Sequence, residues 1–358
     1  MRFERGMVGV ITGAGAGLGR EMALKLAQRG LSLGLCDIDL EAVEQTAELC
    51  RAAASTAASA SAASSGSVGA GPRFLAQRCD VGESAEVFEF ARRVEQELAA
   101  EVGGGVHFVA ANAGIGSVGH FGNEPLEVSE KVMRINLFGV MYTAKAFLPM
   151  LQRQTSGSCL LIMCSIAGII ARPDMSSYCT SKFAVRGFGE CLMLEMAKVS
   201  PHVQVTVVHP GFCATNIFRN AAISPKDPAK GAAGGGGALT RVLDGSPSSQ
   251  DLDKLLRRLS SHSAASAAEI MLRGVERGAT RVLITPEAHA LDFVVRLAPR
   301  LWYTKVGQVL VFSWVGLCKL VGVITPLTWP GVPSLGWDRT FVVAGAAAGA
   351  TMYRRSRL

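Results

Sequence analysis

Short apolar runs alternate with longer amphipathic segments from near residue 7 to residue 285. A short apolar run bounded by turn residues indicates a buried strand, and apolar positions three or four apart indicate a helix that packs on one face. The pattern predicts strands at 7–12, 31–36, 73–80, 106–110, 158–165, 203–208 and 281–285. It predicts helices at 20–29, from about 40, and at 84–101, 129–152, 177–198 and 264–277. This alternation indicates an α/β fold, a doubly wound parallel sheet with helices on both faces.

Two segments interrupt the alternation. Residues 52–71 are nearly all Ala, Ser and Gly and have little apolar volume to bury, so we expect a flexible insertion. Residues 224–263 are irregular and contain the glycine run 234–237, so we expect a mobile lid and a second low-complexity insertion. The pattern therefore predicts a single domain over 1–285 and an apolar extension over 286–358.

Composition narrows the class of protein. Hydrophobic residues make up 49% and charged residues 18%, which is typical of a globular chain. The formal net charge of +7 is spread along the sequence, and without a basic block we expect no nucleic-acid partner. None of the nine cysteines forms a Cys-x-x-Cys pair, and the six histidines lack metal-ligand spacing. We therefore expect reduced thiols in an intracellular protein, no metal, and no signal peptide before the first strand.

A glycine-rich turn separates the first strand from the first helix. It contains Gly13, Ala16, Gly17, Leu18 and Gly19. Glycines let the backbone approach a pyrophosphate, and the N-terminus of the following helix attracts negative charge. Glycines alone are weak evidence in an Ala/Gly-rich chain, but their position between a strand and a helix predicts a dinucleotide-binding (Rossmann) site.

Asp37 ends the second strand, about 20 residues beyond the glycine turn. A carboxylate there accepts hydrogen bonds from the adenosine ribose and repels a 2′-phosphate. Neither Ala16 nor Ile38 supplies a basic group for that phosphate, so the sequence favours NAD over NADP. The alternative is that Asp37 only caps the helix beginning near Leu40.

Other candidate cofactor residues also follow strands. Asp80 and Val81 end the third strand, where a carboxylate can meet an adenine amino group. The fourth strand ends in Asn112, Ala113 and Gly114, and the sixth is followed by Pro210, Gly211 and Thr215. Small residues let the backbone pass close to a ligand, and Thr215 can hold a carboxamide. We expect these groups to meet at the carboxyl edge of the sheet.

Tyr178 and Lys182 lie four residues apart, on one face of the helix 177–198. A tyrosine normally loses its proton near about pH 10, and a nearby ammonium lowers that pKa, so the pair can act as a general acid/base. Ser165 offers a hydroxyl at the end of the fifth strand. Asn136 lies within the helix 129–152, where a solvent-facing side chain is the common outcome.

The C-terminal seventy residues are again apolar. Residues 306–323 are nearly long enough to span a bilayer, 340–352 are too short, and five aromatic residues accompany them. Membrane association through 300–352 and a pair of helices covering the substrate pocket or a subunit contact are both open. The last three residues, 356–358, match a Ser-Lys-Leu peroxisomal address with Arg for Lys. The sequence predicts a cytoplasmic protein, with possible membrane association, or a peroxisomal one if the host reads that address.

Several motifs together resemble the short-chain dehydrogenase/reductase family, in family order from about residue 6 to 285. They are Thr12-Gly13-x-x-x-Gly17-x-Gly19, Asp80, Asn112-Ala113-Gly114, Asn136, Ser165, Tyr178-x-x-x-Lys182 and Pro210-Gly211. The family more often has two asparagines where Ala111-Asn112 stands. Both insertions and the C-terminal segment lie outside the pattern.

The resemblance implies an NAD(P)-dependent oxidoreductase that interconverts an alcohol and a carbonyl without a metal. It implies that Tyr178 transfers the hydroxyl proton, Ser165 binds the substrate oxygen, and Lys182 lowers the tyrosine pKa and binds the nicotinamide ribose. Asn136 would hold a water that links Lys182 to solvent. The glycine turn, Asp37, Asp80 and Asn112 would bind adenosine and pyrophosphate, with Thr215 near the carboxamide. A homodimer or homotetramer is implied, because members commonly pair through the helices that carry Asn136 and Tyr178.

Two other functions compete with this one. A catalytically idle nucleotide-binding protein would use the same fold for redox sensing or scaffolding, but should show a broken Ser/Tyr/Lys set, which is intact here. A dehydratase or epimerase usually modifies that set. Apolar residues near the site suggest a lipophilic substrate such as a lipid, retinoid or steroid, although the same residues could be core. They are Phe121, Phe138, Phe212, Ile217 and Phe218.

Overall fold

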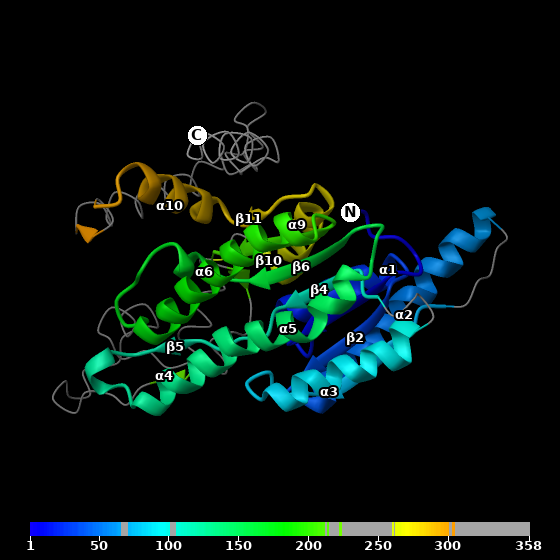
Figure 1. Cartoon of the computed structure of the whole chain (residues 1–358), viewed down its shortest axis with the longest axis horizontal. Coiled ribbons are helices and arrows are strands. Elements are labelled where there is room, and N and C mark those ends of the chain that lie inside the picture. The colour runs from blue at the N-terminus through cyan, green and yellow to red at the C-terminus, as the bar shows by residue number, and fades with distance from the viewer. Residues whose placement is uncertain are drawn as a thin grey trace, which may run out of the picture.

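The protein is built on a parallel seven-stranded sheet with strand order β11-β7-β6-β4-β1-β2-β3 (Figure 1). The computed structural model describes residues 1–65, 71–100, 105–211, 213–214, 222–223, 260, 262–300 and 303–304. The strands are β1 Val8–Thr12, β2 Ser32–Asp37, β3 Phe74–Arg78, β4 Phe108–Ala111, β6 Ser158–Met163, β7 Val203–His209 and β11 Arg281–Leu283. The predicted doubly wound parallel sheet is confirmed. The strand order reverses between β1 and β4, the position where α/β sheets bind ligands.

Helices cover both faces of the sheet and enclose two hydrophobic cores. Along β6, Leu160 and Ile162 enter one core while Cys159, Leu161 and Met163 enter the other. The first core is closed by α3 Ser84–Val94, α5 Gly139–Gln152 and α6 Ser176–Val199. The second is closed by α1 Gly17–Gln28, α2 Leu40–Ser65 and α9 Ala264–Glu276. Each fully buried leucine or phenylalanine contributes about 1.5–3 kcal/mol, and these cores hold the strand ends in register.

Smaller elements complete the described chain. They are α4 Leu126–Met133, α10 Pro286–Leu297, the π turns η1 Glu95–Ala99 and η4 Arg134–Phe138, and the 3₁₀ turns η3 Phe121–Asn123 and η5 Ile166–Gly168. Two-stranded pairs form between β5 Ser117–Val118 and β9 Ala222–Ile223, and between β8 Cys213–Ala214 and β10 His262–Ser263.

The first low-complexity segment is helical, so the expected flexible insertion is wrong over residues 52–65. Helix α2 continues to Ser65 and projects beyond the sheet (Figure 1). Alanine has the highest helix propensity of all residues, so an alanine-rich segment can extend a helix that packing has already nucleated. The hydroxyls of Thr56 and Ser59 each donate to the carbonyl four residues earlier, which removes their competition with the helix.

The predicted helix 129–152 begins three residues earlier and is interrupted. It consists of α4, the π turn η4 and α5, and Asn136 lies in the π turn. A π turn inserts an extra residue into a helix and is frequent at functional sites. The prediction had the extent of this helix nearly right but missed the irregularity that places Asn136.

Several predictions lie outside the described residues. They are Thr215, most of the lid 224–263, Phe212, Ile217, Phe218, and the extension beyond residue 300 apart from 303–304. The first part of the extension forms α10, whose Ala288 and Leu291 pack against isoleucines that follow β6. In the part of the chain that the structure describes, no helix is long and apolar enough to cross a membrane.

Candidate active site

The glycine turn has a backbone that only glycine adopts easily. Gly13 and Gly17 have φ angles of +66° and +55°. A Cβ atom on Gly19 would lie 2.1 Å from the Gly13 carbonyl oxygen. Helix α1 starts after Ala16, with no side-chain cap and no acidic residue in its first turn. The first-turn amides, including that of Leu18, therefore suit an anionic group such as a pyrophosphate.

Asp37 holds the glycine turn and does not cap α2. Its carboxylate accepts hydrogen bonds from the amides of Gly15 at 2.8 Å and Asp39 at 3.1 Å. The capping role belongs to Asp39, whose Oδ1 accepts from the Ala42 amide at 3.0 Å. The alternative interpretation of Asp37 as only a helix cap is therefore wrong, and its carboxylate lies beside the glycine turn.

Asn112 joins the glycine turn to the end of β4. Its Nδ2 donates to the carbonyls of Thr12 at 2.9 Å and Gly13 at 3.1 Å. The Thr12 hydroxyl oxygen accepts from the amides of Asn112 and Ala113. These contacts fix the two strand ends that flank the topological switch point. A Cβ atom on Gly114, the next residue, would lie 3.1 Å from Asn136 Oδ1 and 3.5 Å from Lys182 Nζ, so Gly114 joins the nucleotide region to the catalytic region.

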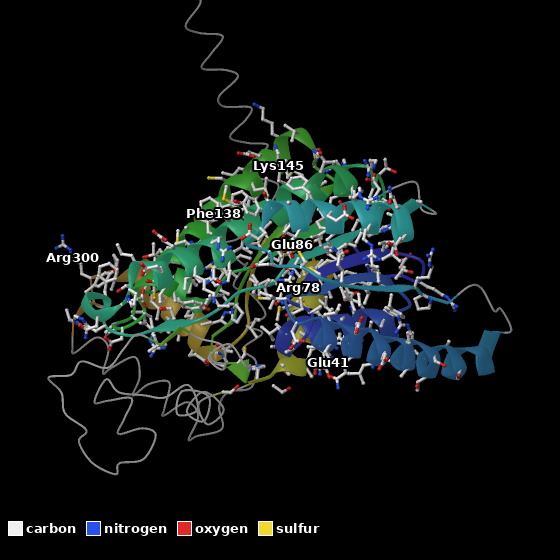
Figure 2. All side chains as sticks on the ribbon, turned by 90° about the horizontal axis from the view of Figure 1, so that it is seen from below. Glu41, Arg78, Glu86, Phe138, Lys145 and Arg300 are labelled. Atoms are coloured by element: carbon white, nitrogen blue, oxygen red, sulfur yellow. The ribbon has the colours of Figure 1, made fainter. Side chains whose placement is uncertain are left out.

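Asp80 and Val81 lie beside the end of β2, because the Cys79 amide donates to the Asp37 carbonyl. Asp80 Oδ1 accepts from the Gly82 amide at 2.8 Å, which orders the turn before α3. Val81 is buried, and a Cβ atom on Gly139 would lie 2.7 Å from it. The Arg78–Glu86 ion pair closes the outer side of this turn (Figure 2). Contact of Asp80 with adenine remains a prediction.

Ser165 and Tyr178 face each other in a dry environment. Ser165 Oγ accepts from the Ala167 amide at 3.1 Å, which leaves its hydroxyl hydrogen to donate elsewhere. Tyr178 is 6% exposed and packs with Ala167, Met175 and Cys179. Burial raises the pKa of the Tyr178 phenol above its ordinary value, and a hydrogen bond with Ser165 opposes that shift.

Lys182 is buried and lies next to the tyrosine. Its Nζ lies 5.8 Å from the centre of the Tyr178 ring and donates to the Met163 carbonyl at 3.1 Å. Burial lowers the pKa of Lys182 to about 8. Burial is the largest influence on the pKa of Tyr178 and raises it, so the lowering expected from Lys182 remains a prediction.

Asn136 is fully buried, so the expectation that it faces solvent is wrong. Its Oδ1 accepts from the Ile115 amide at 2.8 Å, and its Nδ2 donates to the Ile115 carbonyl and to Ser181 Oγ, both at 3.0 Å. A buried amide needs partners for each of its polar atoms, and the π turn points this side chain toward them. Asn136 thus ties the segment after β4 to the helix that carries Tyr178 and Lys182.

The loop after β7 packs against the loop that follows Ser165. The Ile166 amide donates to the Pro210 carbonyl at 2.8 Å. A Cβ atom on Gly211 would lie 1.9 Å from Thr285 Oγ1, so this position requires glycine. Pro210 and Gly211 therefore lie at the carboxyl edge, as expected.

A second set of residues near Tyr178 was not predicted from the sequence. The Glu124 carboxylate accepts from Ser117 Oγ at 2.7 Å, from Ser129 Oγ at 2.9 Å and from Ser177 Oγ. It thereby ties β5 and α4 to the first turn of α6, directly beside Tyr178. These serines lie far apart in the sequence and share no motif, so only the tertiary structure reveals the cluster.

Arg20 was missed as well. Its guanidinium donates to the Gly15 carbonyl and to Thr46 Oγ1, which attaches the glycine turn to α2. The sequence signal was available, since an arginine directly follows the last glycine of the motif. Among the described residues, no group of three His, Cys, Asp or Glu side chains could hold a metal ion.

Comparisons with known proteins agree with this geometry. A family model described as short chain dehydrogenase matches residues 7–225. A relative from Mycobacterium tuberculosis named as the oxidoreductase SadH is 34% identical over 295 residues. The match covers 82% of this chain and 91% of the relative. A short-chain dehydrogenase/reductase from Burkholderia phymatum, solved in complex with NAD, covers 84% of this chain and 96% of that chain with 25% identity and a TM-score of 0.66.

Two further relatives match over shorter stretches. Epidermal retinol dehydrogenase 2 of Mus musculus is 34% identical over 214 residues, which are 60% of this chain and 62% of the relative. Retinol dehydrogenase 10 of Xenopus tropicalis is 35% identical over 227 residues, covering 61% of this chain and 65% of the relative. The family match over more than half of the chain confirms the resemblance seen in the motifs: this chain belongs to the short-chain dehydrogenase/reductase family and is an NAD(P)-binding oxidoreductase.

Proposed function

We propose that the protein interconverts a lipophilic alcohol and its carbonyl compound with NAD, using Tyr178 as general acid/base. The observation that carries the proposal is the meeting of Ser165, Tyr178 and Lys182 with Asn136 and Gly114 at the carboxyl edge of the sheet. Tyr178 and Lys182 come from α6, Ser165 from the segment after β6, Gly114 from the segment after β4, and Asn136 from the π turn η4. An idle nucleotide-binding protein has no need to keep such a set assembled.

The residues beside the glycine turn fit NAD. The uncapped N-terminus of α1 suits the pyrophosphate, and the Asp37 carboxylate suits ribose hydroxyls while opposing a 2′-phosphate. Gly13, Gly17 and Gly19 have no side chains, so a ligand can approach the backbone of the turn closely. When bound, NAD supplies the carbon that accepts or returns hydride.

The protein's own groups handle the proton and the substrate oxygen. Ser165 donates its hydroxyl hydrogen to that oxygen, and the Tyr178 phenolate takes the proton of the alcohol. Lys182 uses one of its donors on the Met163 carbonyl and keeps the others for a ribose and for the charge near the phenolate. Asn136 holds Ser181 and Ile115 beside this lysine. Because burial raises the pKa of Tyr178, alcohol oxidation should speed up as pH rises.

Apolar surroundings of Tyr178 and the retinol dehydrogenase relatives support a lipophilic substrate. Ala167, Met175 and Cys179 pack around the tyrosine together with Val118. Two of the phenylalanines proposed from the sequence are exposed in the structure: Phe121 is 56% exposed, and Phe138 is 43% exposed and stacks on Tyr142 of α5 (Figure 2). Phe138, the last residue of the π turn η4, thus lies on the outer surface beside α5, and its contact with substrate is not supported.

Turnover by Tyr178→Phe tests the proposal. Purified protein is assayed with NAD and either retinol or decan-2-ol, following absorbance of the reduced cofactor, with glycerol as a small polar comparison. We expect the variant to lose at least about a hundredfold in kcat, the typical contribution of a general acid/base, while it still binds NADH. Unchanged turnover refutes the role of Tyr178, and preference for glycerol refutes the lipophilic substrate.

We also propose a homodimer or homotetramer. The face formed by α4, α5 and α6 exposes Leu126, Phe138, Phe183 and Leu194, an apolar surface that a second copy can cover. Light scattering measures the mass directly, and a monomer at micromolar concentration contradicts the proposal. Leu126→Lys and Leu194→Lys together should then shift the mass to that of one chain.

Membrane association through 300–352 and a peroxisomal address at 356–358 remain proposals from the sequence, since these residues lie outside the described ones. Vesicle flotation of the full chain tests the first, because a protein that stays unbound at low and high salt contradicts it. A fluorescent reporter that carries the last ten or so residues tests the second, because diffuse signal contradicts it.

A further inference from the structure

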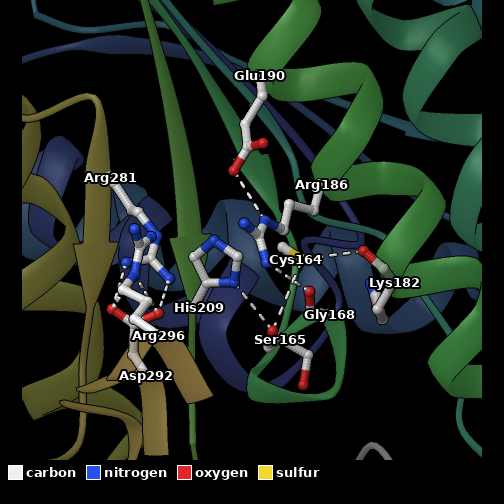
Figure 3. A network of polar contacts seen from close by, with 10 residues as sticks. All are labelled: Cys164, Ser165, Gly168, Lys182, Arg186, Glu190, His209, Arg281, Asp292 and Arg296. Atoms are coloured by element: carbon white, nitrogen blue, oxygen red, sulfur yellow. Dashed lines mark hydrogen bonds and ion pairs between the residues drawn. The ribbon is translucent and has the colours of Figure 1, made fainter. Parts of the chain in front are cut away.

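Two groups of polar contacts lie between Ser165 and α10, one at His209 and one at Asp292 (Figure 3). The main-chain carbonyl of Ser165 accepts a hydrogen bond from His209 Nδ1 at 3.0 Å. His209 is the last residue of β7, and β11 lies beside it with Leu283 in register. Arg281, two residues earlier on β11, faces the same side of the sheet and reaches α10. Ser165 and α10 are thus joined through two neighbouring strands.

The His209 ring is held in one protonation state and one tautomer. A carbonyl oxygen only accepts, so Nδ1 must carry the hydrogen. Burial and the nearby Arg281 charge lower the pKa of His209 to about 3. The hydrogen bond to the Ser165 carbonyl and the Asp292 charge act against this shift, and Arg186 acts with it. His209 is completely buried, and its Nε2 has no hydrogen-bond partner among the described residues. The ring therefore donates to Ser165 at every pH where an alcohol dehydrogenase would be assayed.

Asp292 fixes the second group of contacts. Its two oxygens each accept from one Arg281 nitrogen at 2.6 Å, and Arg296 adds a further contact at 3.0 Å. The Asp292 side chain is only 11% exposed, and such a bidentate pair defines a geometry as well as an attraction. Arg281 is thereby held where its charge adds to the effect of burial, which keeps His209 neutral.

The segment that carries Ser165 also contacts α6 and α10. On the α6 side, the Cys164 thiol donates to the Lys182 carbonyl at 3.2 Å, and Arg186 donates to the Gly168 carbonyl at 3.5 Å. On the α10 side, Ala288 and Leu291 pack against the isoleucines of the segment after Ser165, which are Ile166, Ile169 and Ile170. The segment that carries Ser165 thus lies between the catalytic helix and the first helix of the C-terminal extension.

We propose that His209 is a positioning residue for Ser165 and that α10, anchored by Asp292 and Arg281, supports the Ser165 loop in the geometry that lets the serine reach Tyr178 and the substrate oxygen. This inference rests on the proposed function. It gives the start of the C-terminal extension a task in catalysis, separate from any contact with membrane. His209 itself touches neither substrate nor the reacting atoms.

Displacement of Ser165 should raise the pKa of Tyr178. The hydrogen bond from Ser165 opposes the rise in the pKa of Tyr178 that burial causes. When Ser165 moves away, the groups that remain around the phenol are Lys182, Cys164 and Cys179. Without the opposing hydrogen bond, burial raises the pKa of Tyr178 further, so the alcohol-oxidation profile should move to higher pH. A purely structural role of His209 would lower the amount of folded enzyme without moving this profile.

The test compares His209→Leu, which removes the donor, with His209→Asn, whose amide can donate near the position of Nδ1. Full-length variants are assayed from pH 6 to pH 10.5 with NAD and decan-2-ol. For His209→Leu we expect kcat to fall about tenfold, the size of one lost hydrogen bond, and the profile of kcat/KM to move about one unit upward. The fall in kcat should exceed any rise in the KM for NAD, which separates loss of Ser165 positioning from disturbance of Pro210 and Gly211, the candidate cofactor residues after His209. His209→Asn should restore both quantities.

His202→Leu is the matched control. His202 Nε2 also contacts a carbonyl, that of Gln152 at 2.9 Å, but it precedes the opposite end of β7. It should leave kcat and the profile unchanged. Asp292→Asn tests the second group of contacts and should move the profile in the same direction by a smaller amount.

An unchanged profile in folded His209→Leu overturns the inference. If that variant does not fold, an unchanged profile in both Asp292→Asn and Arg281→Met overturns it. Tyr178→Phe separates failure of the proposed function from failure of the positioning role of His209. Full turnover in that variant refutes the proposed function itself. Lost turnover there, together with unaltered His209→Leu, refutes the positioning role alone.

Discussion

The nucleotide side and the catalytic side of the sheet edge are built in different ways. On the nucleotide side, the candidate residues lie at or just after the ends of β1, β2, β3 and β4, and close backbone packing around the glycine turn sets the geometry. On the catalytic side, Asn136, Ser165, Tyr178 and Lys182 come from a π turn, a loop and a helix, and side-chain hydrogen bonds hold them. The first region should be sensitive to added volume and the second to lost hydrogen bonds.

The largest effect is expected from Gly19→Ala on the nucleotide side. The added Cβ would lie 2.1 Å from the Gly13 carbonyl oxygen, so the turn must open and the first amides of α1 must shift. We expect NADH affinity, measured by fluorescence titration, to fall at least about a hundredfold, because overpacking a fixed backbone is not relieved by side-chain motion.

Gly187→Ala is the control for this variant. Gly187 lies in α6 and a Cβ there would meet nothing within 4 Å. It should keep NADH affinity and gain up to about 1 kcal/mol of stability from helix propensity. Retained affinity in Gly19→Ala would contradict the role of backbone packing.

The next effect is expected from Asn136→Ala on the catalytic side. The change leaves the half-buried Ile115 amide and carbonyl and the buried Ser181 hydroxyl without their partner, so the free energy of unfolding should fall by about 1–3 kcal/mol. We expect kcat to fall about tenfold while NADH affinity stays nearly constant, since the loss concerns hydrogen bonds beside Lys182. The exposed Asn123, changed to Ala, is the control. Equal losses of kcat and NADH affinity in Asn136→Ala would contradict the separation of the nucleotide side from the side that carries Asn136.

Asp37→Ser should change cofactor preference. Removing the carboxylate deletes an acceptor for ribose and the repulsion of a 2′-phosphate, so we expect the preference for NAD over NADP to fall about tenfold. Asp39→Ala removes only the α2 cap, and should cost about 1 kcal/mol of stability without altering the preference. Ratios of kcat/KM for the two cofactors measure the outcome, and an unchanged ratio in Asp37→Ser would assign the discrimination to other residues.

The smallest effect at neutral pH is expected for the contribution of His209 to the free energy of unfolding. Its folded pKa is about 3, below the ordinary value of about 6.5 expected in the unfolded chain. Between these values the unfolded chain binds a proton that the folded protein does not, so this contribution to stability is complete above about pH 6.5 and is lost as pH falls toward 3. Denaturant unfolding of His209→Asn should therefore show a weaker decline over this window than the wild type. Parallel declines would mean that His209 titrates normally.

The sequence predicted the sheet and the glycine turn, and paired Tyr178 with Lys182 as a candidate site, because these signals are local. A strand followed by glycines and a helix, or a tyrosine four residues before a lysine, can be recognised within one short stretch. The alanine-rich segment misled the prediction, because low apolar content suggested a flexible loop whereas alanine propensity extends α2. The solvent-facing position expected for Asn136 failed because a π turn leaves no clear periodic signal.

The amino-acid sequence by itself thus determined the α/β class, the order of strands and helices, and a carboxylate, that of Asp37, at the end of the second strand. Only the tertiary structure decided which partners those side chains have. It assigned the α2 cap to Asp39, gave Asn136 its contacts with Ile115, gathered three serines on Glu124, and joined His209 to Ser165. The physical reason is distance along the chain: these contacts connect residues that meet only after the sheet forms, and burial then sets their pKa values.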